Sequence, residues 1–206
     1  IFKKMGFAPQ SLAHDHFASC VLLGDWYKKL PAGASIITEQ ELLSLDLSSV
    51  ISGFQNESKR RPDGLWKFNI GSEKTFVALE VELHAKSDND YIEIIRSYDS
   101  HFSIEKIIWV VEGAWLVKKI FNLVHKHSNL KPNDHLFLLA GEVKKDLWLA
   151  QIKNEELKKV TLGEYLSSFC YLLKNPPSND LSNAISNRHG MIRECVPTQV
   201  LFNFKT

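Results

Sequence analysis

The segment from residue 61 to residue 86 constrains the fold more than any other part of the sequence. Two arms rich in strand-forming residues flank a Gly-Ser turn at residues 71–72, which predicts a β-hairpin. Because side chains alternate along a strand, the second arm has one aliphatic face and one face that carries Glu80, Glu82 and His84. Successive residues on a face lie about 7 Å apart, so the hairpin predicts a row of two carboxylates and an imidazole.

A third carboxylate belongs to the same hairpin. Asp63 begins the first arm directly after Pro62, and the pairing register, which the sequence leaves open, decides whether it lies beside Glu80. Carboxylates within a few ångströms of one another raise each other's pKa and oppose burial, and a hard divalent cation relieves that repulsion. We therefore expect Mg²⁺ or Mn²⁺ to be held by Asp63, Glu80 and Glu82. The alternative is an exposed sheet face on which the acids are solvated.

Length and composition predict one globular domain. The 206 residues, of which 44% are hydrophobic, are enough for a substantial core. We expect a core domain over residues 1–174, followed by a linker and C-terminal extension over residues 175–206 that begins in a stretch rich in Pro, Ser and Asn. The chain begins with Ile1 rather than Met, which predicts that an upstream segment precedes it.

Net charge, cysteine content and hydropathy indicate which partners and which cellular compartment to expect. The formal net charge of +1 provides no global electrostatic argument for nucleic-acid binding. Three widely spaced cysteines predict thiols in a reducing compartment, and hence a cytoplasmic protein, rather than a disulfide framework or a zinc site. No apolar run approaches the ~20 residues that a membrane span needs, so we expect no membrane association.

The order of the predicted elements indicates the fold class. The expected elements are a helix over 11–30, strands over 34–38, 61–70 and 75–86, a helix over 90–100, a strand over 107–111, a helix over 114–127, strands over 135–140 and 146–152, and a helix over 161–173. Capping boxes are expected at three helix starts, namely Thr38-x-x-Glu41, Asp90-x-x-Glu93 and Thr161-x-x-Glu164. This order predicts an α/β (α+β) fold with a mixed central sheet flanked by helices on both faces.

Cationic residues lie on either side of the acidic strand. Lys59, Arg60 and Arg61 stand just before Pro62, where they form either a solvated loop or a set of phosphate contacts beside the acids. Arg96, on the helix that follows the hairpin, is a further expected DNA contact.

The order of these motifs resembles a known nuclease core. Pro62-Asp63-Gly64, then Glu80-Val81-Glu82 at the end of an apolar strand, then a helix and the strand at 107–111, resembles the PD-(D/E)xK nucleases. More narrowly, the pattern is similar to the replication-relaxation family and to MobC-type plasmid mobilisation relaxases, in which a histidine in an early helix is typical and His14 is the match. The resemblance covers about residues 10–170. It implies a restriction-endonuclease-like core and a metal-dependent DNA endonuclease that nicks one strand at a plasmid transfer or replication origin.

The resemblance also implies partners and residue roles. The partners would be origin DNA, relaxosome accessory proteins and coupling proteins. Asp63 and Glu80 would hold Mg²⁺ or Mn²⁺, which polarises the scissile phosphate. Glu82 would ligate the metal or accept a proton, and His14 would orient the phosphate or protonate a leaving oxygen.

One position departs from the family pattern and leaves other functions open. The last motif residue is lysine in the usual nuclease pattern and is Glu82 here. Lys86, four residues on, or Arg96 is expected to reach back and take the place of that lysine in catalysis. The alternatives are a catalytically weak DNA-binding protein that controls replication or mobilisation on the same fold, and an α/β domain with incidental acids. Metal-dependent nicking and salt-sensitive DNA binding distinguish the three.

Overall fold

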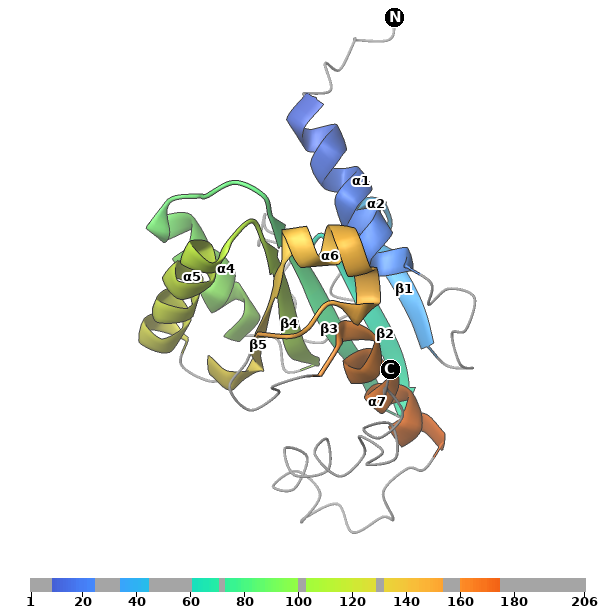
Figure 1. The fold of residues 1–206 in the computed structure, drawn as a ribbon. Coiled ribbons are helices and arrows are strands. Elements are labelled where there is room, and N and C mark those ends of the chain that lie inside the picture. Colours follow the sequence, from blue (N-terminus) through green and yellow to red (C-terminus); the bar gives the residue numbers. More distant parts are fainter. Residues whose placement is uncertain are drawn as a thin grey trace, which may run out of the picture.

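The computed structural model describes residues 9–24, 34–44, 61–70, 73–99, 103–128, 132–153 and 160–174. A five-stranded sheet occupies the centre of this part of the chain (Figure 1), in the order β1-β2-β3-β4-β5. Its strands are β1 (Ala34–Thr38), β2 (Gly64–Ile70), β3 (Glu73–Glu82), β4 (Ile104–Val111) and β5 (His135–Leu139). The first three strands pair antiparallel, whereas β3, β4 and β5 pair parallel. The predicted α/β fold with a mixed sheet is therefore confirmed.

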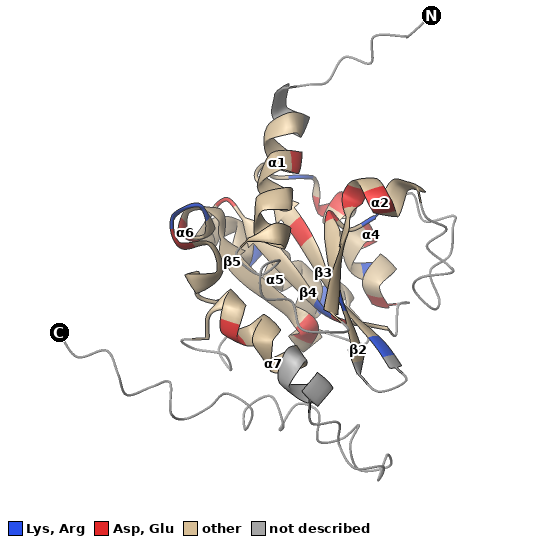
Figure 2. Ribbon diagram, turned by 90° about the vertical axis from the view of Figure 1, so that its right-hand side faces the viewer, with Lys and Arg blue, Asp and Glu red and all other residues tan. Residues whose placement is uncertain are grey.

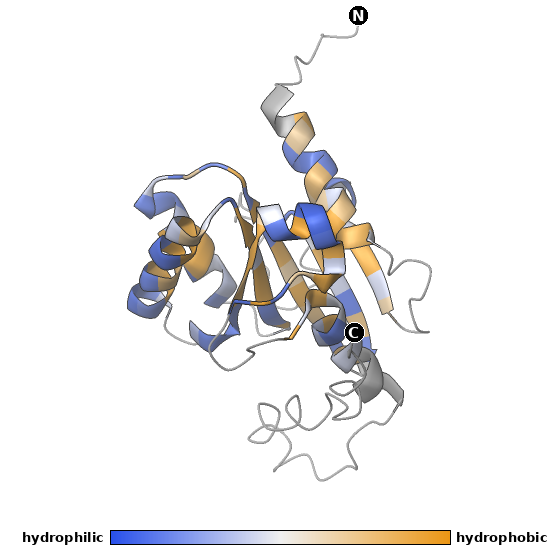
Figure 3. Cartoon of the chain, in the orientation of Figure 1, coloured by the Kyte–Doolittle hydropathy of each residue, from blue (hydrophilic) through white to orange (hydrophobic). Residues whose placement is uncertain are grey.

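Helices cover both faces of the sheet (Figure 1). One face is covered by α1 (Pro9–Leu23), α6 (Ala140–Asp146), the short 3-10 helix η3 (Leu147–Leu149) and α7 (Leu162–Lys174); the other is covered by α2 (Glu39–Ser44), α4 (Asp88–Asp99) and α5 (Ala114–His127). A second 3-10 helix, η2 (Pro132–Asp134), precedes β5. Each face buries its own apolar cluster, so the sheet separates two hydrophobic cores. Figure 3 shows the middle of the sheet mainly in hydrophobic colours and the outer sides of α5 and α6 in hydrophilic ones.

The strand that carries the acids is buried on both faces. Val77 belongs to the core under α1, whereas its neighbour Phe76 belongs to the core that α4 and α5 cover. Central strands of such sheets are covered on both sides, because helices pack on either face. The alternative of a solvated acidic face is therefore wrong, since Glu80 and Glu82 are both buried. His84, the imidazole of the predicted row, lies beyond the end of β3 and is exposed.

Most of the predicted elements are confirmed. The two hairpin arms pair as β2 and β3, and their turn at residues 71–72 lies outside the described residues. The Glu41 carboxylate accepts the Thr38 N–H at 2.8 Å, and the Glu164 carboxylate accepts the Thr161 N–H at 2.9 Å, so two of the predicted capping boxes are present. The remaining matches are β1, β4, α5, β5 and α7.

α4 begins earlier than predicted, because a different residue caps it. The helix starts at Asp88, and Ser87 is the cap. The Ser87 hydroxyl accepts the Asp90 N–H at 3.3 Å, and the Asp90 carboxylate accepts the Ser87 N–H at 3.3 Å. Asp90, the predicted cap, is therefore the acceptor that reaches back in this capping box. This box fixes the end of the connection that leaves β3.

The strand predicted over residues 146–152 is wrong. α6 begins directly after β5, in a stretch of helix-forming Ala, Glu and Lys residues, and η3 follows it. Trp148 explains the departure, because its indole N–H donates to the Val21 carbonyl of α1 at 2.9 Å and its ring is buried in the core beneath α1. Beyond it, Gln151 forms an isolated β-bridge with Thr161.

α1 ends at Leu23 rather than at residue 30. Gly24 adopts a positive φ of 34°, and its N–H donates to the Cys20 carbonyl at 2.9 Å, as in a glycine-terminated helix. The remainder of the predicted helix and the predicted extension over 175–206 lie outside the described residues. None of the helices in the described ranges has the length and apolarity that crossing a bilayer requires.

Candidate functional site

Strand pairing brings the first acid of the hairpin to the second. β2 and β3 pair with Gly64 opposite Leu79, and the Asp63 N–H donates to the Leu79 carbonyl at 3.0 Å. Asp63 directly precedes Gly64 and Glu80 directly follows Leu79, so the start of β2 brings Asp63 to the end of β3 that carries Glu80. The register that the sequence leaves open is thus one that brings the two acids to the same end of the paired strands.

A cavity of about 230 Å³ opens where this pair meets α2 and α4. Its lining combines three carboxylates with a lysine, an arginine and a tyrosine. The lining residues are Glu39, Leu43, Arg61, Pro62, Asp63, Glu80, Lys86, Ile94, Ser97 and Tyr98. Figure 2 shows acidic colouring on α2 and on the strand ends next to it. Three segments that are distant in sequence therefore converge on one polar hollow.

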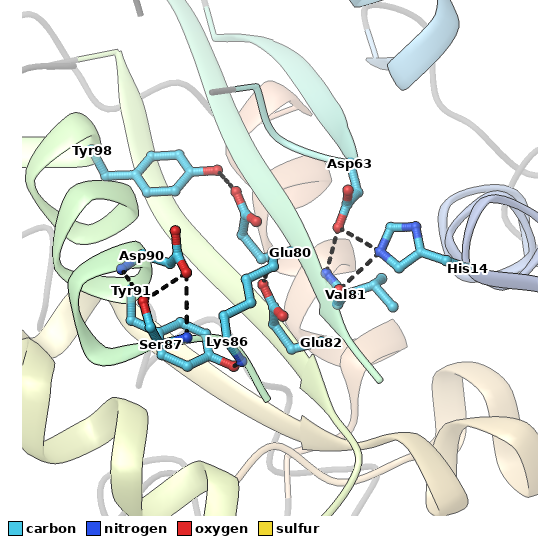
Figure 4. A network of polar contacts seen from close by, with 10 residues as sticks. All are labelled: His14, Asp63, Glu80, Val81, Glu82, Lys86, Ser87, Asp90, Tyr91 and Tyr98. Atoms are coloured by element: carbon cyan, nitrogen blue, oxygen red, sulfur yellow. Dashed lines mark hydrogen bonds and ion pairs between the residues drawn. The ribbon is translucent and has the colours of Figure 1, made fainter. Parts of the chain in front are cut away.

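Glu80 is the buried acid of the site. Only 6% of the residue is exposed, and the Tyr98 hydroxyl of α4 donates to its carboxylate (Figure 4). Burial raises the pKa of Glu80 well above its usual value, and the charge of Asp63 raises it further, whereas the Tyr98 hydrogen bond opposes the shift. A cation bound between Asp63 and Glu80 would reverse this shift by favouring the ionised form.

Asp63 is held by the backbone of β3 and by a side chain of α1. Its carboxylate accepts the Val81 N–H at 2.6 Å, and His14 Nε2 lies 3.5 Å from the same oxygen (Figure 4). That nitrogen also lies 2.9 Å from the Val81 carbonyl, and His14 Nδ1 lies 3.3 Å from the Asp15 carboxylate. Both ring nitrogens thus face acceptors, as an imidazolium requires.

His14 contacts Asp63 but does not line the cavity. The hydrogen bond to Asp63 raises the pKa of His14 to about 10 from its usual 6.5, an effect that burial opposes and the Asp63 charge reinforces. The residue is absent from the cavity lining given above. Its contacts therefore orient the Asp63 carboxylate and tie α1 to the end of β3.

The lysine four residues beyond Glu82 reaches back to it. Lys86 Nζ lies 2.5 Å from Glu82 Oε1, and Glu82 is only 2% exposed. Burial raises the pKa of Glu82, an effect that Lys86 opposes. Burial lowers the pKa of Lys86, but the contact with Glu82 and the charges of Glu80 and Asp63 together outweigh it, and the pKa is raised. Lys86 lines the cavity and Glu82 does not. The site thus contains an ammonium group, which comes from Lys86 and not from position 82, where the nuclease pattern has its lysine.

Two of the four predicted DNA contacts lie in the described part of the chain. Arg61 lines the cavity, and its Nη1 donates to the Leu42 carbonyl of α2 at 2.8 Å. Arg96 is exposed on α4 and is not a lining residue. Lys59 and Arg60 lie outside the described residues. Of the described pair, Arg61 alone is placed beside the acids.

Glu39 and Tyr98 complete the lining, although sequence reasoning does not identify them as site residues. Glu39 opens α2, and its pKa is raised by burial and then by the charge of Asp63. Thr38 pairs with Gly64, so Glu39 follows a strand end that adjoins the hairpin. The capping box at Thr38 predicts the start of α2, but no local pattern shows which strand β1 pairs with, so Glu39 could not be placed at the site. For Tyr98, helical spacing predicts only that it lies on the buried side of its helix.

The donor set fits an open, hydrated cation site rather than a closed cage. Among the described residues, no three His, Cys, Asp or Glu side chains are grouped so as to hold a metal ion. Mg²⁺ needs only one or two carboxylates because it keeps several waters, and Asp63 and Glu80 both border the cavity. The volume of about 230 Å³ has room for such waters at about 30 Å³ each. Glu82, the third predicted ligand, is paired with Lys86 instead.

No family model, curated protein sequence or solved structure matches this chain. Its function is therefore inferred from the geometry of the site.

Proposed function

We propose that this chain is a metal-dependent DNA endonuclease with a restriction-endonuclease-like core, a relaxase that nicks one strand at a plasmid transfer or replication origin. One observation carries the proposal: Asp63 and Glu80, each next to a residue of the pair Gly64–Leu79, border the same cavity as Lys86 and Arg61. Two carboxylates and a cation around one hollow are the groups that metal-assisted phosphodiester hydrolysis needs. A cytoplasmic location, origin DNA, relaxosome accessory proteins and coupling proteins belong to the same proposal.

Asp63 and Glu80 are the proposed holders of Mg²⁺ or Mn²⁺. When bound there, the cation supplies Lewis-acid activation of a phosphate ester. Asp63 is oriented by Val81 and His14, and Glu80 by Tyr98, so both carboxylates are in place before a ligand arrives. Such preorganisation lowers the cost of binding charge in a buried site.

Lys86 is the proposed substitute for the lysine of the nuclease pattern. Because its pKa is raised, the side chain is an ammonium at neutral pH and acts by stabilising phosphate charge or orienting water rather than as a base. Glu82, at the position of the motif lysine, holds that ammonium at the cavity. Arg61 provides a second cation on the lining, where it would contact a phosphate.

Nicking of supercoiled plasmid carrying a candidate origin tests this proposal. We expect open-circle product with Mg²⁺ or Mn²⁺, none with EDTA, and none from Asp63→Asn or Glu80→Gln. Asparagine is preferred to alanine because its amide oxygen still accepts the Val81 N–H. Glu112→Gln is the matched control, an exposed acid at the end of β4 whose backbone N–H donates to the Glu82 carbonyl. Full activity of Asp63→Asn would contradict the proposal.

A second candidate function is favoured by the glutamate that replaces the lysine of the nuclease pattern. This residue is Glu82, and its negative charge offsets the positive charge of Lys86. The site therefore has less uncompensated positive charge for binding phosphate than a nuclease site that carries the motif lysine. The chain would then be a catalytically weak DNA-binding protein that controls replication or mobilisation. DNA binding that weakens steeply with salt, without any nicked product, would favour this function. An α/β domain with incidental acids would show neither.

A further inference from the structure

Lys86 lies in a connection that has no regular structure, yet its backbone is held on both sides. Residues 83–87 join β3 to α4 without helix or strand. The Lys86 N–H donates to the Tyr91 hydroxyl at 3.1 Å, and the Lys86 carbonyl accepts from Lys119 Nζ at 3.1 Å. The first partner belongs to α4 and the second to α5, so two helices fix one loop residue.

The two partners are themselves fixed. Lys119 Nζ lies 2.8 Å from the Asp88 carboxylate and 5.4 Å from the centre of the Tyr91 ring, a cation–π arrangement. Tyr91 is fully buried and packs edge-on against Trp109 of β4, with ring centres 6.3 Å apart. The hydroxyl that meets the Lys86 N–H therefore stands on a rigid base within the core.

We propose that Lys119 and Tyr91 form a clamp that positions the Lys86 ammonium against Glu82 at the cavity. The clamp makes Lys119, on a helix that does not line the cavity, a positioning residue for phosphodiester cleavage. This inference rests on the proposed function and adds to it the means by which a lysine outside the motif reaches the site.

The geometry explains why a clamp is needed. A lysine in a strand has its backbone held by the ladder, whereas Lys86 follows the strand end and has a long side chain with much rotamer freedom. The contact with Glu82 fixes only the tip of that side chain. Holding the N–H and the carbonyl fixes its base as well, so the ammonium is confined from both ends. A misplacement of about 1 Å in such a site lowers the rate by up to about a hundredfold.

The first test observes the Lys86 ammonium directly in the full chain. Signals of ¹⁵N-labelled lysine ammonium groups appear where exchange with water is slow, as in a fixed ion pair, and Lys86→Gln assigns the one of interest. We expect the signal in wild type, its loss or shift in Lys119→Met, and its return in Lys119→Arg, which keeps donors for the carbonyl. Lys118→Met, which removes the neighbouring exposed lysine of α5, should leave it unchanged. An unchanged Lys86 signal in folded Lys119→Met would overturn the clamp.

The second test measures nicking by the same variants. We expect Lys119→Met and Tyr91→Phe to lower kcat by about tenfold to a hundredfold with little change in KM, while Lys118→Met behaves as wild type. Asp88→Asn, which keeps Lys119 but removes its ion pair, should lower kcat less and serves if Lys119→Met fails to fold. Wild-type kcat in Lys119→Met would overturn the positioning role. Absence of nicking by wild type would overturn the proposed function, while the ammonium signal would still decide the clamp.

Discussion

At the scale of single residues, Asp63 is the point at which the N-terminal helix and the hairpin are joined. Its carboxylate accepts from Val81 and faces His14, and its backbone continues the pairing of β2 with β3. A residue with these contacts is fixed before any ligand binds. The same contacts make His14 part of the stability of the fold as well as of the site.

The pH dependence of stability reports the ion pair between His14 and Asp63. The hydrogen bond to Asp63 raises the pKa of His14 to about 10 from 6.5. Between these values the folded chain holds a proton that the unfolded chain has lost, so the contribution of His14 is complete below pH 6.5 and is lost as the pH rises through 10.

We therefore expect the free energy of unfolding to fall as the pH rises from 6.5 towards 10, with a flatter profile in His14→Gln. Glutamine retains a side-chain donor for the Val81 carbonyl but has no proton to lose in this range. Urea unfolding at a series of pH values measures the profile. Equal slopes for the two proteins would show that His14 is not charged against Asp63.

At the scale of elements, the end of α1, the helix that carries His14, packs against Trp148. Gly24 has a φ of 34°, and a Cβ placed on it would lie 2.6 Å from the Trp148 ring. Trp148 in turn donates to the Val21 carbonyl, so the helix end and the indole are packed as one unit. The chain accepts only glycine there without strain.

Gly24→Ala should lower the free energy of unfolding by about 2 kcal/mol or more, from a left-handed backbone and overpacking against Trp148. Gly141→Ala is the control, because Gly141 lies in α6 and a Cβ there meets nothing within 4 Å. We expect the control to be neutral or slightly stabilising. Chemical denaturation of both variants measures the difference, and equal stabilities would argue against a packed end for α1.

Local patterns predict most elements, and the errors have identifiable causes. Alternation and capping patterns are local, and they indicate the hairpin, α5 and α7 correctly. Leu147, Trp148 and Leu149 form an apolar run that suits a strand or a short helix equally well, and the contact of Trp148 with α1 decides between them. The sequence contains two overlapping capping-box patterns, Ser87-x-x-Asp90 and Asp90-x-x-Glu93. The prediction for the start of α4 is wrong because it used the second pattern, whereas the structure uses the first.

The candidate site depends more on long-range pairing than the elements do. Asp63 and Glu80 are visible as acids in the sequence, but only the pairing of Gly64 with Leu79 brings them to the same cavity. Glu39 enters the lining through the pairing of β1 with β2, and Lys119 reaches Lys86 across the packing of α5 on α4. No short pattern encodes contacts between residues so far apart in the chain.

At the scale of the whole molecule, the site lies at one end of β3, where helices from both faces of the sheet come close to the strand. α1 reaches it through His14 from one face of the sheet, while α2 and α4 line it from the other. A divalent cation bound between Asp63 and Glu80 would therefore stabilise the contacts among α1, α2, α4 and β3. Binding to the folded chain alone raises its stability in proportion to the logarithm of the cation concentration above Kd.

Calorimetric titration of Mn²⁺ into the full chain tests the central claim most directly. Wild type and Glu112→Gln should bind the cation with the same Kd, whereas Asp63→Asn should lose binding or weaken it by at least about tenfold, a change of about 1.4 kcal/mol. Glu80→Gln should behave like Asp63→Asn, because each removes one of two carboxylates at the cavity. Binding of Mn²⁺ with the wild-type Kd in both variants would contradict the account.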